Sequence, residues 1–232
     1  FILGIGILIA WRSPGRYLKD QGTSQLGASC KHQQRATKNC PMVFELLMIR
    51  ILDVLFAAVG MLVLSPLFLL VLILGWFDTR SSLFRQERVG RNRQPFTLVK
   101  FRTMRLDMVS IASHLADASA ITPLGRFLRR TKLDELPQLW NVLCGDMSLV
   151  GPRPCLFNQH DLIAERAARD VFDVRPGITG LAQIQGIDMS TPELLAKTDA
   201  EMLRQMNAFK YFRYISLTIL GKGAGDRVRI KS

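Results

Sequence analysis

The run VLFAAVGMLVLSPLFLLVLILGWF, residues Val54–Phe77, contains no charged side chain. A bilayer core about 30 Å thick is crossed by about 20 apolar residues in a helix, so this run is long enough to enter a membrane. A core helix of a soluble protein rarely stays uncharged over such a length. The run therefore predicts a membrane segment.

Ser65 and Pro66 stand at the middle of this run. Proline lacks an amide hydrogen and its ring clashes with the carbonyl four residues earlier, so a kink or break is expected here. Basic residues, which concentrate on the cytoplasmic side of membrane segments, flank both ends. They are Lys31, Arg35, Lys38 and Arg50 before the run and Arg80, Arg85, Arg88, Arg91 and Arg93 after it. A re-entrant helix with both ends in the cytoplasm satisfies these observations, but proline kinks also occur in helices that cross the bilayer, so both arrangements stay open.

The composition favours anionic partners. The 232 residues include 31 Lys and Arg against 19 Asp and Glu, a net charge of +12. Such a surplus suits nucleic acid, an anionic membrane surface or phosphorylated substrates, and does not choose among them. The cysteines lack C-x-x-C spacing, which favours reduced thiols over a zinc site or a disulfide framework. They are Cys30, Cys40, Cys144 and Cys155.

Residues 1–41 differ in character from the rest of the chain. Phe1–Trp11 is apolar but too short to span a bilayer, and Ser13–Pro41 is polar and basic without helical or strand periodicity. A clean small-residue cleavage site is missing, so a secretory signal fits poorly. We expect residues 1–41 to be a poorly ordered or non-native extension that activity does not need.

A β-hairpin is predicted after the apolar run. In SLFRQERVGRNRQPFTLVKFRTM, residues Ser82–Met104, two runs of strand-forming residues flank Gly90–Arg93. The cations of these strands, Lys100 and Arg102 among them, could form a basic binding face. A solvated strand edge, where Lys and Arg discourage aggregation, explains them equally well.

The stretch ITPLGRFLRRTKLDELPQLWNVLCGDMSLVGPRP, residues Ile121–Pro154, carries the candidate chemistry. Gly125–Lys132 is basic and partly apolar, as in a helix that rests on a membrane surface. Asp134 and Glu135 follow at once. Because proline is tolerated in the first turn of a helix, Pro137 predicts that the next helix starts near Asp134. The two acids then either stabilise that helix start, or supply an ionised carboxylate that attacks phosphorus or holds a divalent cation.

Two proline-rich turns present arginines. Gly151-Pro152-Arg153-Pro154 fixes the backbone around Arg153, which suits bidentate contact with phosphate but also describes a rigid turn with a solvent-facing side chain. Arg175–Gly180 repeats the pattern. Thr191–Leu220 has helical spacing of Met202, Met206, Phe209, Phe212 and Ile215, which indicates packing or membrane-surface contact.

In this order, the motifs resemble those of a known family. They are the apolar run with Ser65-Pro66, FRQERVGRNRQPFTLVKFRTM, LRRTKLDELPQLWNVLCGDMSLVGPRP and VRPGITGLAQ. The series is similar to the bacterial sugar transferase family, the monotopic polyprenyl-phosphate phosphoglycosyl transferases in their minimal form. The resemblance covers about residues 43–220. Ser81-Ser82 departs from the Gly-Pro that many members carry before the first strand.

The resemblance implies an α+β fold that is mainly helical. Residues 42–79 would form a re-entrant helix-break-helix. Residues 80–220 would form a compact cytosolic phosphoglycosyl transferase domain with a small β-hairpin and amphipathic surface helices, and residues 221–232 a basic tail. The protein would lie on the cytoplasmic face of the bacterial inner membrane, in contact with its lipid, and a homodimer stays open.

The resemblance also implies the reaction. A sugar 1-phosphate would pass from a UDP-sugar to undecaprenyl or another polyprenyl phosphate, with release of UMP, as the first membrane step of a surface glycan pathway. Asp134 would be the nucleophile that carries the phosphosugar covalently. Glu135 would assist through Mg²⁺ or by handling a proton, so that both acids are metal ligands. The loop that frames the nucleotide would include Arg175, Pro176, Gly177, Thr179 and Gln183.

A cluster of cations is expected around these acids. Donor and acceptor both carry phosphate, and phosphoryl transfer depends on positioning and charge neutralisation. The phosphate-binding candidates are Arg153, Lys100, Arg102, Arg129 and Arg130.

A rival interpretation is a non-catalytic membrane anchor whose basic face binds anionic lipid or nucleic acid. It leaves Asp134-Glu135 between cationic runs unexplained, and the sequence contains no nucleic-acid-binding motif, so nucleic acid is not expected as a partner.

Overall fold

The computed structural model describes residues 39–105 and 120–223, with side chains from residue 47 onward. A compact unit, Met42–Ser232, begins just before the apolar run. The predictions for the extension 1–41 and for the tail 221–232 fall mostly outside the described residues.

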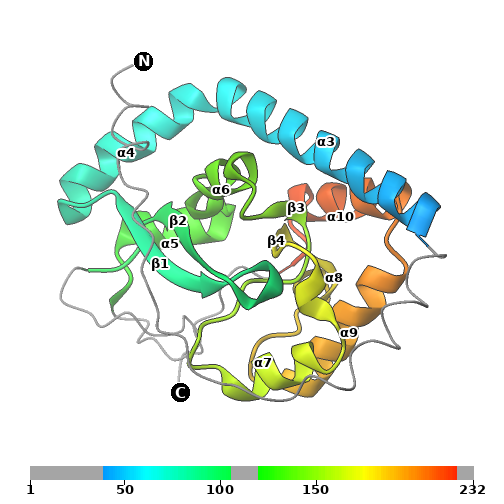
Figure 1. Cartoon of the computed structure of the whole chain (residues 1–232). Coiled ribbons are helices and arrows are strands. Elements are labelled where there is room, and N and C mark those ends of the chain that lie inside the picture. Colours follow the sequence, from blue (N-terminus) through cyan, green and yellow to red (C-terminus); the bar gives the residue numbers. More distant parts are fainter. Residues whose placement is uncertain (1–38, 106–119, 224–232) are drawn as a thin grey trace. The chain divides into compact units, whose positions relative to one another are not determined.

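Two helices form the apolar run (Figure 1). These are α3 (Asn39–Val63) and α4 (Ser65–Thr79), and the pair is bent by 64°. Pro66 lies in the first turn of α4, where a missing amide hydrogen breaks no hydrogen bond of that helix. The hydroxyl of Ser65 donates to the carbonyl oxygen of Leu62 at 2.8 Å. The bend therefore falls at the predicted break.

The bent pair exposes apolar side chains. No single helix within the described residues is both long and apolar enough to cross a membrane, whereas the two bent helices taken together meet the requirements of length and composition. An exposed apolar surface of this kind marks an interaction with another protein or with lipid. Its most exposed members are Leu62, Val63, Leu69, Trp76 and Phe77.

The predicted hairpin is confirmed. Strands β1 (Leu83–Val89) and β2 (Pro95–Phe101) pair antiparallel over their full length. The short 3-10 turn η1 (Arg91–Arg93) connects them, and its residues Asn92 and Arg93 have positive φ values of 54° and 61°. Asn tolerates this left-handed conformation better than most residues, which explains its place in the turn.

The next segment carries the candidate acids. Helix α5 (Pro123–Thr131) is followed by the 3-10 turn η4 (Leu133–Glu135) and by α6 (Gln138–Cys144). The hydroxyl oxygen of Thr122 accepts from the amide of Gly125 at 2.9 Å and so caps the N-terminus of α5. The predicted basic helix is thus present.

A second sheet went unnoticed in the sequence. Strands β3 (Ser148–Val150) and β4 (Gly177–Thr179) pair in parallel. Each has only three residues, too few for an alternating pattern to be recognised. A Cβ on Gly177 would come within 2.0 Å of the amide nitrogen of Gly151, so the two chains approach this closely only because both residues are glycine.

The C-terminal part is helical. The predicted helical pattern at residues 191–220 is confirmed and forms two helices, since the side chain of Asn207 accepts from the amide of Lys210 and starts the second one. Met202 is fully buried, but Phe209 is 76% exposed. The elements are α7 (His160–Ala167), η5 (Val171–Asp173), α8 (Leu181–Ile184), α9 (Pro192–Arg204) and α10 (Ala208–Ile219).

Both helices of the bent pair contribute to the core. Ala57 of α3 is buried in one cluster with Leu98 of β2 and Val142 of α6. Val71 of α4 is buried in another with Phe101 of β2 and Leu128 of α5. One side of the apolar run therefore packs on β2 and on the two helices that flank the acid-bearing turn, while its other side is exposed.

Candidate active site

Asp134 and Glu135 lie in the turn η4, between α5 and α6. The prediction that a helix starts near Asp134 is correct only for a short 3-10 turn, which begins at Leu133, because the α-helix α6 begins at Gln138 with Pro137 as its N-cap residue. The preceding residues form a tighter 3-10 turn. Neither acid is thus the N-cap of α6, which weakens the purely structural explanation for them.

Lys132 sets the direction of this turn. Its backbone is left-handed, with a φ of 59°, and its amide donates to the carbonyl oxygens of Arg129 and Leu128, which ends α5. A non-glycine residue in this conformation loses roughly 1–2 kcal/mol. The chain therefore accepts some strain immediately before the two acids, as is common at functional sites.

Both acids are at least partly buried, and Glu135 is paired with a cation. Asp134 is only 6% exposed, and Glu135 is half-buried. The guanidinium of Arg153 donates from Nη2 to Oε1 of Glu135 at 3.1 Å. Burial lowers the pKa of the Lys132 ammonium and nearby Arg153 lowers it further, whereas Glu135 opposes the shift. Acidic and basic groups thus share one partly dehydrated site.

The backbone of Arg153 is fixed from two sides. The amide of Gly177 donates to the carbonyl oxygen of Pro152 at 2.9 Å, and Nη1 of Arg166 donates to that of Arg153 at 2.8 Å. Arg166 is itself buried in an ion pair with Asp199, with Nη2 2.6 Å from Oδ2. The expected rigid turn is therefore present, and its arginine points to an acid.

Two candidates on the hairpin lie beside one aromatic ring. Lys100 Nζ is 5.7 Å and the Arg102 guanidinium carbon 5.4 Å from the centre of the Phe84 ring. Burial lowers the pKa of Arg102. Strand β2 also contacts η4. The strand that carries Lys100 therefore packs against the turn that carries the acids.

Arg129 and Arg130 of α5 have different surroundings. Arg129 donates from Nε to the hydroxyl of Thr103 at 2.9 Å, whereas Arg130 is exposed. Among the described residues, the buried atoms Arg129 Nη1 and Arg102 Nε lack a hydrogen-bond partner. A buried guanidinium donor without a partner is unfavourable, so an anion or water is expected there.

The two neighbouring carboxylates suit one kind of metal ion. Within the described residues, no group of three or more His, Cys, Asp and Glu side chains is arranged to hold a metal. Mg²⁺ is commonly bound by one or two carboxylates together with substrate phosphates and water. Asp134 and Glu135 match that donor set.

The sequence of residues 44–222 matches the family model described as bacterial sugar transferase. The chain belongs to this family. The predictions of the family and of a sugar-transferring enzyme are thereby confirmed.

Several curated proteins are similar in sequence to this chain. The chain is 35% identical over 193 residues, 75% of its length, to the galactosyl transferase CpsE of Streptococcus agalactiae. It is 38% identical over 179 residues, 73% of its length, to the UDP-glucose:undecaprenyl-phosphate glucose-1-phosphate transferase of Caulobacter vibrioides. An uncharacterized sugar transferase of Bacillus subtilis, EpsL, is 43% identical over 136 residues, 59% of this chain. The matches span 43%, 66% and 67% of these relatives, respectively.

The surroundings of the residues expected on the nucleotide side differ from those of the acids. Arg175 donates from Nε to the carbonyl oxygen of Gly145 at 2.8 Å, at the C-terminal end of α6, whereas the acids precede its N-terminal end. Gln183 donates from Nε2 to the carbonyl oxygen of Ile178, and its Oε1 is buried without a hydrogen-bond partner in the described chain. Thr179 shares a hydrogen bond with the hydroxyl of Thr218.

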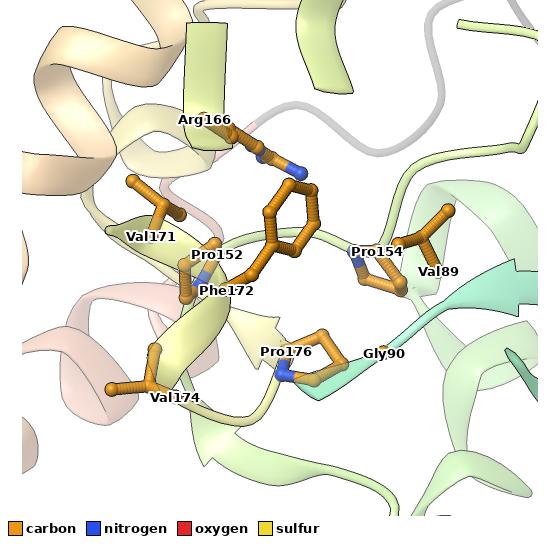
Figure 2. A pocket seen from close by; sticks show the side chains of 9 residues that line it. All are labelled: Val89, Gly90, Pro152, Pro154, Arg166, Val171, Phe172, Val174 and Pro176. Atoms are coloured by element: carbon orange, nitrogen blue, oxygen red, sulfur yellow. The ribbon is translucent and has the colours of Figure 1, made fainter. Parts of the chain in front are cut away.

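Pro176 lines a small pocket next to the arginine turn (Figure 2). Pro152 and Pro154, which flank Arg153, line the same pocket together with the ring of Phe172. Arg153 is not among the lining residues, and its guanidinium contacts Glu135. Rigid rings on both sides thus restrict the backbone that presents Arg153.

Several residues that shape the site went unnoticed in the sequence. Arg166 and Asp199 are 33 positions apart, and no local pattern pairs them. Asp53 is 2% exposed at the start of the apolar run, in contact with β3 and α10. An acid at the edge of an apolar segment is a recognisable signal, since such charges seldom occur without a partner.

Proposed function

We propose that this chain transfers a sugar 1-phosphate from a UDP-sugar to a polyprenyl phosphate, such as undecaprenyl phosphate, and releases UMP. The observation that carries the proposal is the buried carboxyl group of Asp134 beside the Glu135–Arg153 ion pair. The relative from Caulobacter vibrioides and an undecaprenyl-phosphate glucose phosphotransferase of Komagataeibacter xylinus, 36% identical, support the donor and acceptor classes by their names.

The reaction has two displacement steps. A carboxylate oxygen of Asp134 attacks the sugar-proximal phosphorus, and the bond from that phosphorus to the bridging oxygen breaks, so that UMP leaves with the electron pair. A phosphate oxygen of the polyprenyl phosphate then attacks the same phosphorus. The Asp134 carboxylate leaves, and a polyprenyl diphosphate sugar is formed.

The cations neutralise charge as these steps proceed. Arg153 and Lys132 lie next to Glu135, where they meet a diphosphate that approaches Asp134. The partnerless buried nitrogens of Arg102 and Arg129 bind phosphate oxygens of the substrates. The turn Arg175–Gln183 frames the nucleotide side.

Asp134 and Glu135 would hold Mg²⁺ together with the diphosphate. When bound, the ion supplies positive charge that offsets the repulsion between the carboxylates and the phosphates. Glu135 would then contact both this ion and Arg153. Chelation of divalent cations should therefore lower the rate, and added Mg²⁺ should restore it.

The bent pair fits a re-entrant segment on the cytoplasmic face of the inner membrane. Its exposed apolar side enters the lipid and its other side packs on the catalytic elements. The site then lies where a lipid-borne phosphate and a water-soluble donor meet. The lipid-linked product is the starting material of a surface glycan.

The decisive experiment measures UMP release from UDP-sugars in the presence of polyprenyl phosphate and Mg²⁺. Asp134→Asn should abolish release, because an amide is a poor nucleophile. With a donor labelled in its sugar-proximal phosphate and no acceptor, label should stay on the wild-type protein and be absent from the variant. Asp161→Asn, which changes an exposed acid on α7, is the matched control and should behave as wild type.

Robust release by the Asp134→Asn variant would refute the nucleophile. A wild-type protein that binds anionic vesicles but releases no UMP from any UDP-sugar would favour the non-catalytic basic module instead.

A further inference from the structure

Polar side chains stand at both ends of the otherwise apolar bent pair. The N-terminal junction consists of Arg50 and Asp53. Arg50 donates from Nη2 to the carbonyl oxygen of Val142 at 2.7 Å and from Nη1 to that of Met147 at 3.3 Å. Val142 lies in the last turn of α6, so Arg50 binds the C-terminal end of this helix, where cations are favourable.

Asp53 extends the N-terminal junction to two further elements. Its Oδ1 accepts from the amide of Leu149 in β3 at 2.9 Å and from the hydroxyl of Tyr211 in α10 at 2.8 Å. Strand β3 leads directly into the turn that presents Arg153. The same side chain therefore holds the strand that positions the arginine of the active site.

The C-terminal junction is Asp78, near the end of α4. Its Oδ2 accepts from the hydroxyl of Thr122 at 2.6 Å, and the oxygen of that hydroxyl accepts from the amide of Gly125. Thr122 is the N-cap residue of α5. Asp78 thus fixes the hydroxyl group that starts the helix before the acid pair.

The two junctions hold opposite ends of one segment. Helix α5 starts at the C-terminal junction, α6 ends at the N-terminal junction, and Asp134 and Glu135 lie between the helices. A membrane anchor needs only an apolar surface and has no use for a buried acid. Attachment to lipid therefore does not explain these polar contacts, which hold the ends of α5 and α6 in place.

We propose that Arg50, Asp53 and Asp78 are positioning residues for the transfer reaction, so that the bent pair is part of the scaffold of the active site as well as its anchor. The inference rests on the function proposed above. Displacement of a reacting group by about 1 Å can lower a rate about 100-fold. Contacts that hold both ends of the acid-bearing segment should therefore affect kcat more than substrate binding.

The test compares Asp53→Ala with Asp53→Asn, and Asp78→Ala with Asp78→Asn, as full chains in vesicles. Asn keeps an acceptor oxygen and Ala does not. UMP release is measured at saturating donor and acceptor, per folded molecule. Asp53→Ala should lower kcat about 10–100-fold with donor KM within threefold, and Asp78→Ala, at an exposed residue, about 3–10-fold. Both Asn variants should stay within about threefold of wild type.

Tyr211→Phe covers the case that Asp53→Ala does not fold, since it removes one donor to Asp53 and keeps the ring. It should lower kcat at least about threefold. Asp161→Ala, on α7, is the control for loss of a carboxylate and should leave kcat unchanged. Hydrogen exchange should also rise in residues 133–144 of the Asp53→Ala variant relative to α9.

A wild-type kcat in Tyr211→Phe and in the Ala variants would overturn the inference, as would an equal loss in Asp53→Ala and Asp53→Asn. If the wild-type protein itself releases no UMP, the proposed function has failed, which is a different result.

Discussion

Nη2 of Arg153 lies 3.1 Å from Oε1 of Glu135, although the two residues are 18 positions apart. The contact places the arginine of a proline-rich turn against the turn that carries Asp134. Both side chains are partly buried, 25% and 15% exposed, so that water screens their charges less than on an open surface. It is this pair that makes two separate motifs into one site.

Arg153→Lys should lower kcat/KM for UMP release about 10–100-fold. A lysine supplies the charge but not the planar, two-pronged donor that matches both a carboxylate and a phosphate. The measurement is steady-state UMP release in vesicles. Arg130→Lys, on the exposed side of α5, is the comparison and should change kcat/KM less than threefold. Equal effects of the two changes would contradict the role given to Arg153.

Because of Lys132, binding of the UDP-sugar donor should weaken at alkaline pH. Burial and Arg153 lower the pKa of its ammonium below the ordinary value of 10.5, and its positive charge is lost as the pH rises through this lowered pKa. The KM for the UDP-sugar should then increase on the alkaline side. Lys132→Arg should move that increase to higher pH, because a guanidinium stays protonated. KM measured between about pH 7 and 10 provides the check, and superimposable profiles would rule out the assignment.

Asp199→Ala should destabilise the protein by about 3–5 kcal/mol, because it leaves the buried guanidinium of Arg166 without its partner. Thermal or chemical unfolding in detergent measures the effect. Glu165→Ala, which removes a more exposed ion pair between the helix that carries Arg166 and the nearby Arg169, is the matched control at below about 1 kcal/mol. The double variant Arg166→Met with Asp199→Leu should recover stability. Similar losses from both single changes would show that burial of the first pair does not matter.

Both ends of the bent pair should be accessible from the cytoplasmic side. In a background without the native cysteines, Leu47→Cys and Arg80→Cys should react with a membrane-impermeant thiol reagent added to inside-out vesicles and not to right-side-out vesicles. Leu62→Cys, close to the bend and 71% exposed in the protein, should be shielded by lipid in both. Labelling of the two ends from opposite sides would mean that the segment spans the bilayer.

The sequence by itself determined the features that depend on neighbouring residues. Pro66 cannot continue the helix before it, so the bend falls where the sequence predicts it. The hairpin is likewise local, since Gly90–Arg93 favours a turn between two strand-forming runs. The family motifs, read in order, also indicated the family and made the acid pair and the arginine turn candidates for the site.

One local rule failed at the site itself. Pro137 correctly predicted that an α-helix begins nearby, since it is the N-cap residue of α6. Lys132, however, adopts a left-handed backbone, and the acids form a 3-10 turn before α6 begins. That conformation is strained for an isolated lysine. Packing of η4 against β2 and α5 must stabilise it, and such packing is not encoded in a short stretch of sequence.

Only the tertiary structure decided which charged groups meet. Glu135 pairs with Arg153, Asp199 pairs with Arg166, and Asp53 accepts a hydrogen bond from β3, all between positions distant in the sequence. Each contact needs the desolvated surroundings that the folded core creates, because in the unfolded chain water satisfies the same groups. Local sequence therefore determined the elements and their chemistry, whereas long-range burial selected the partners that turn them into a site.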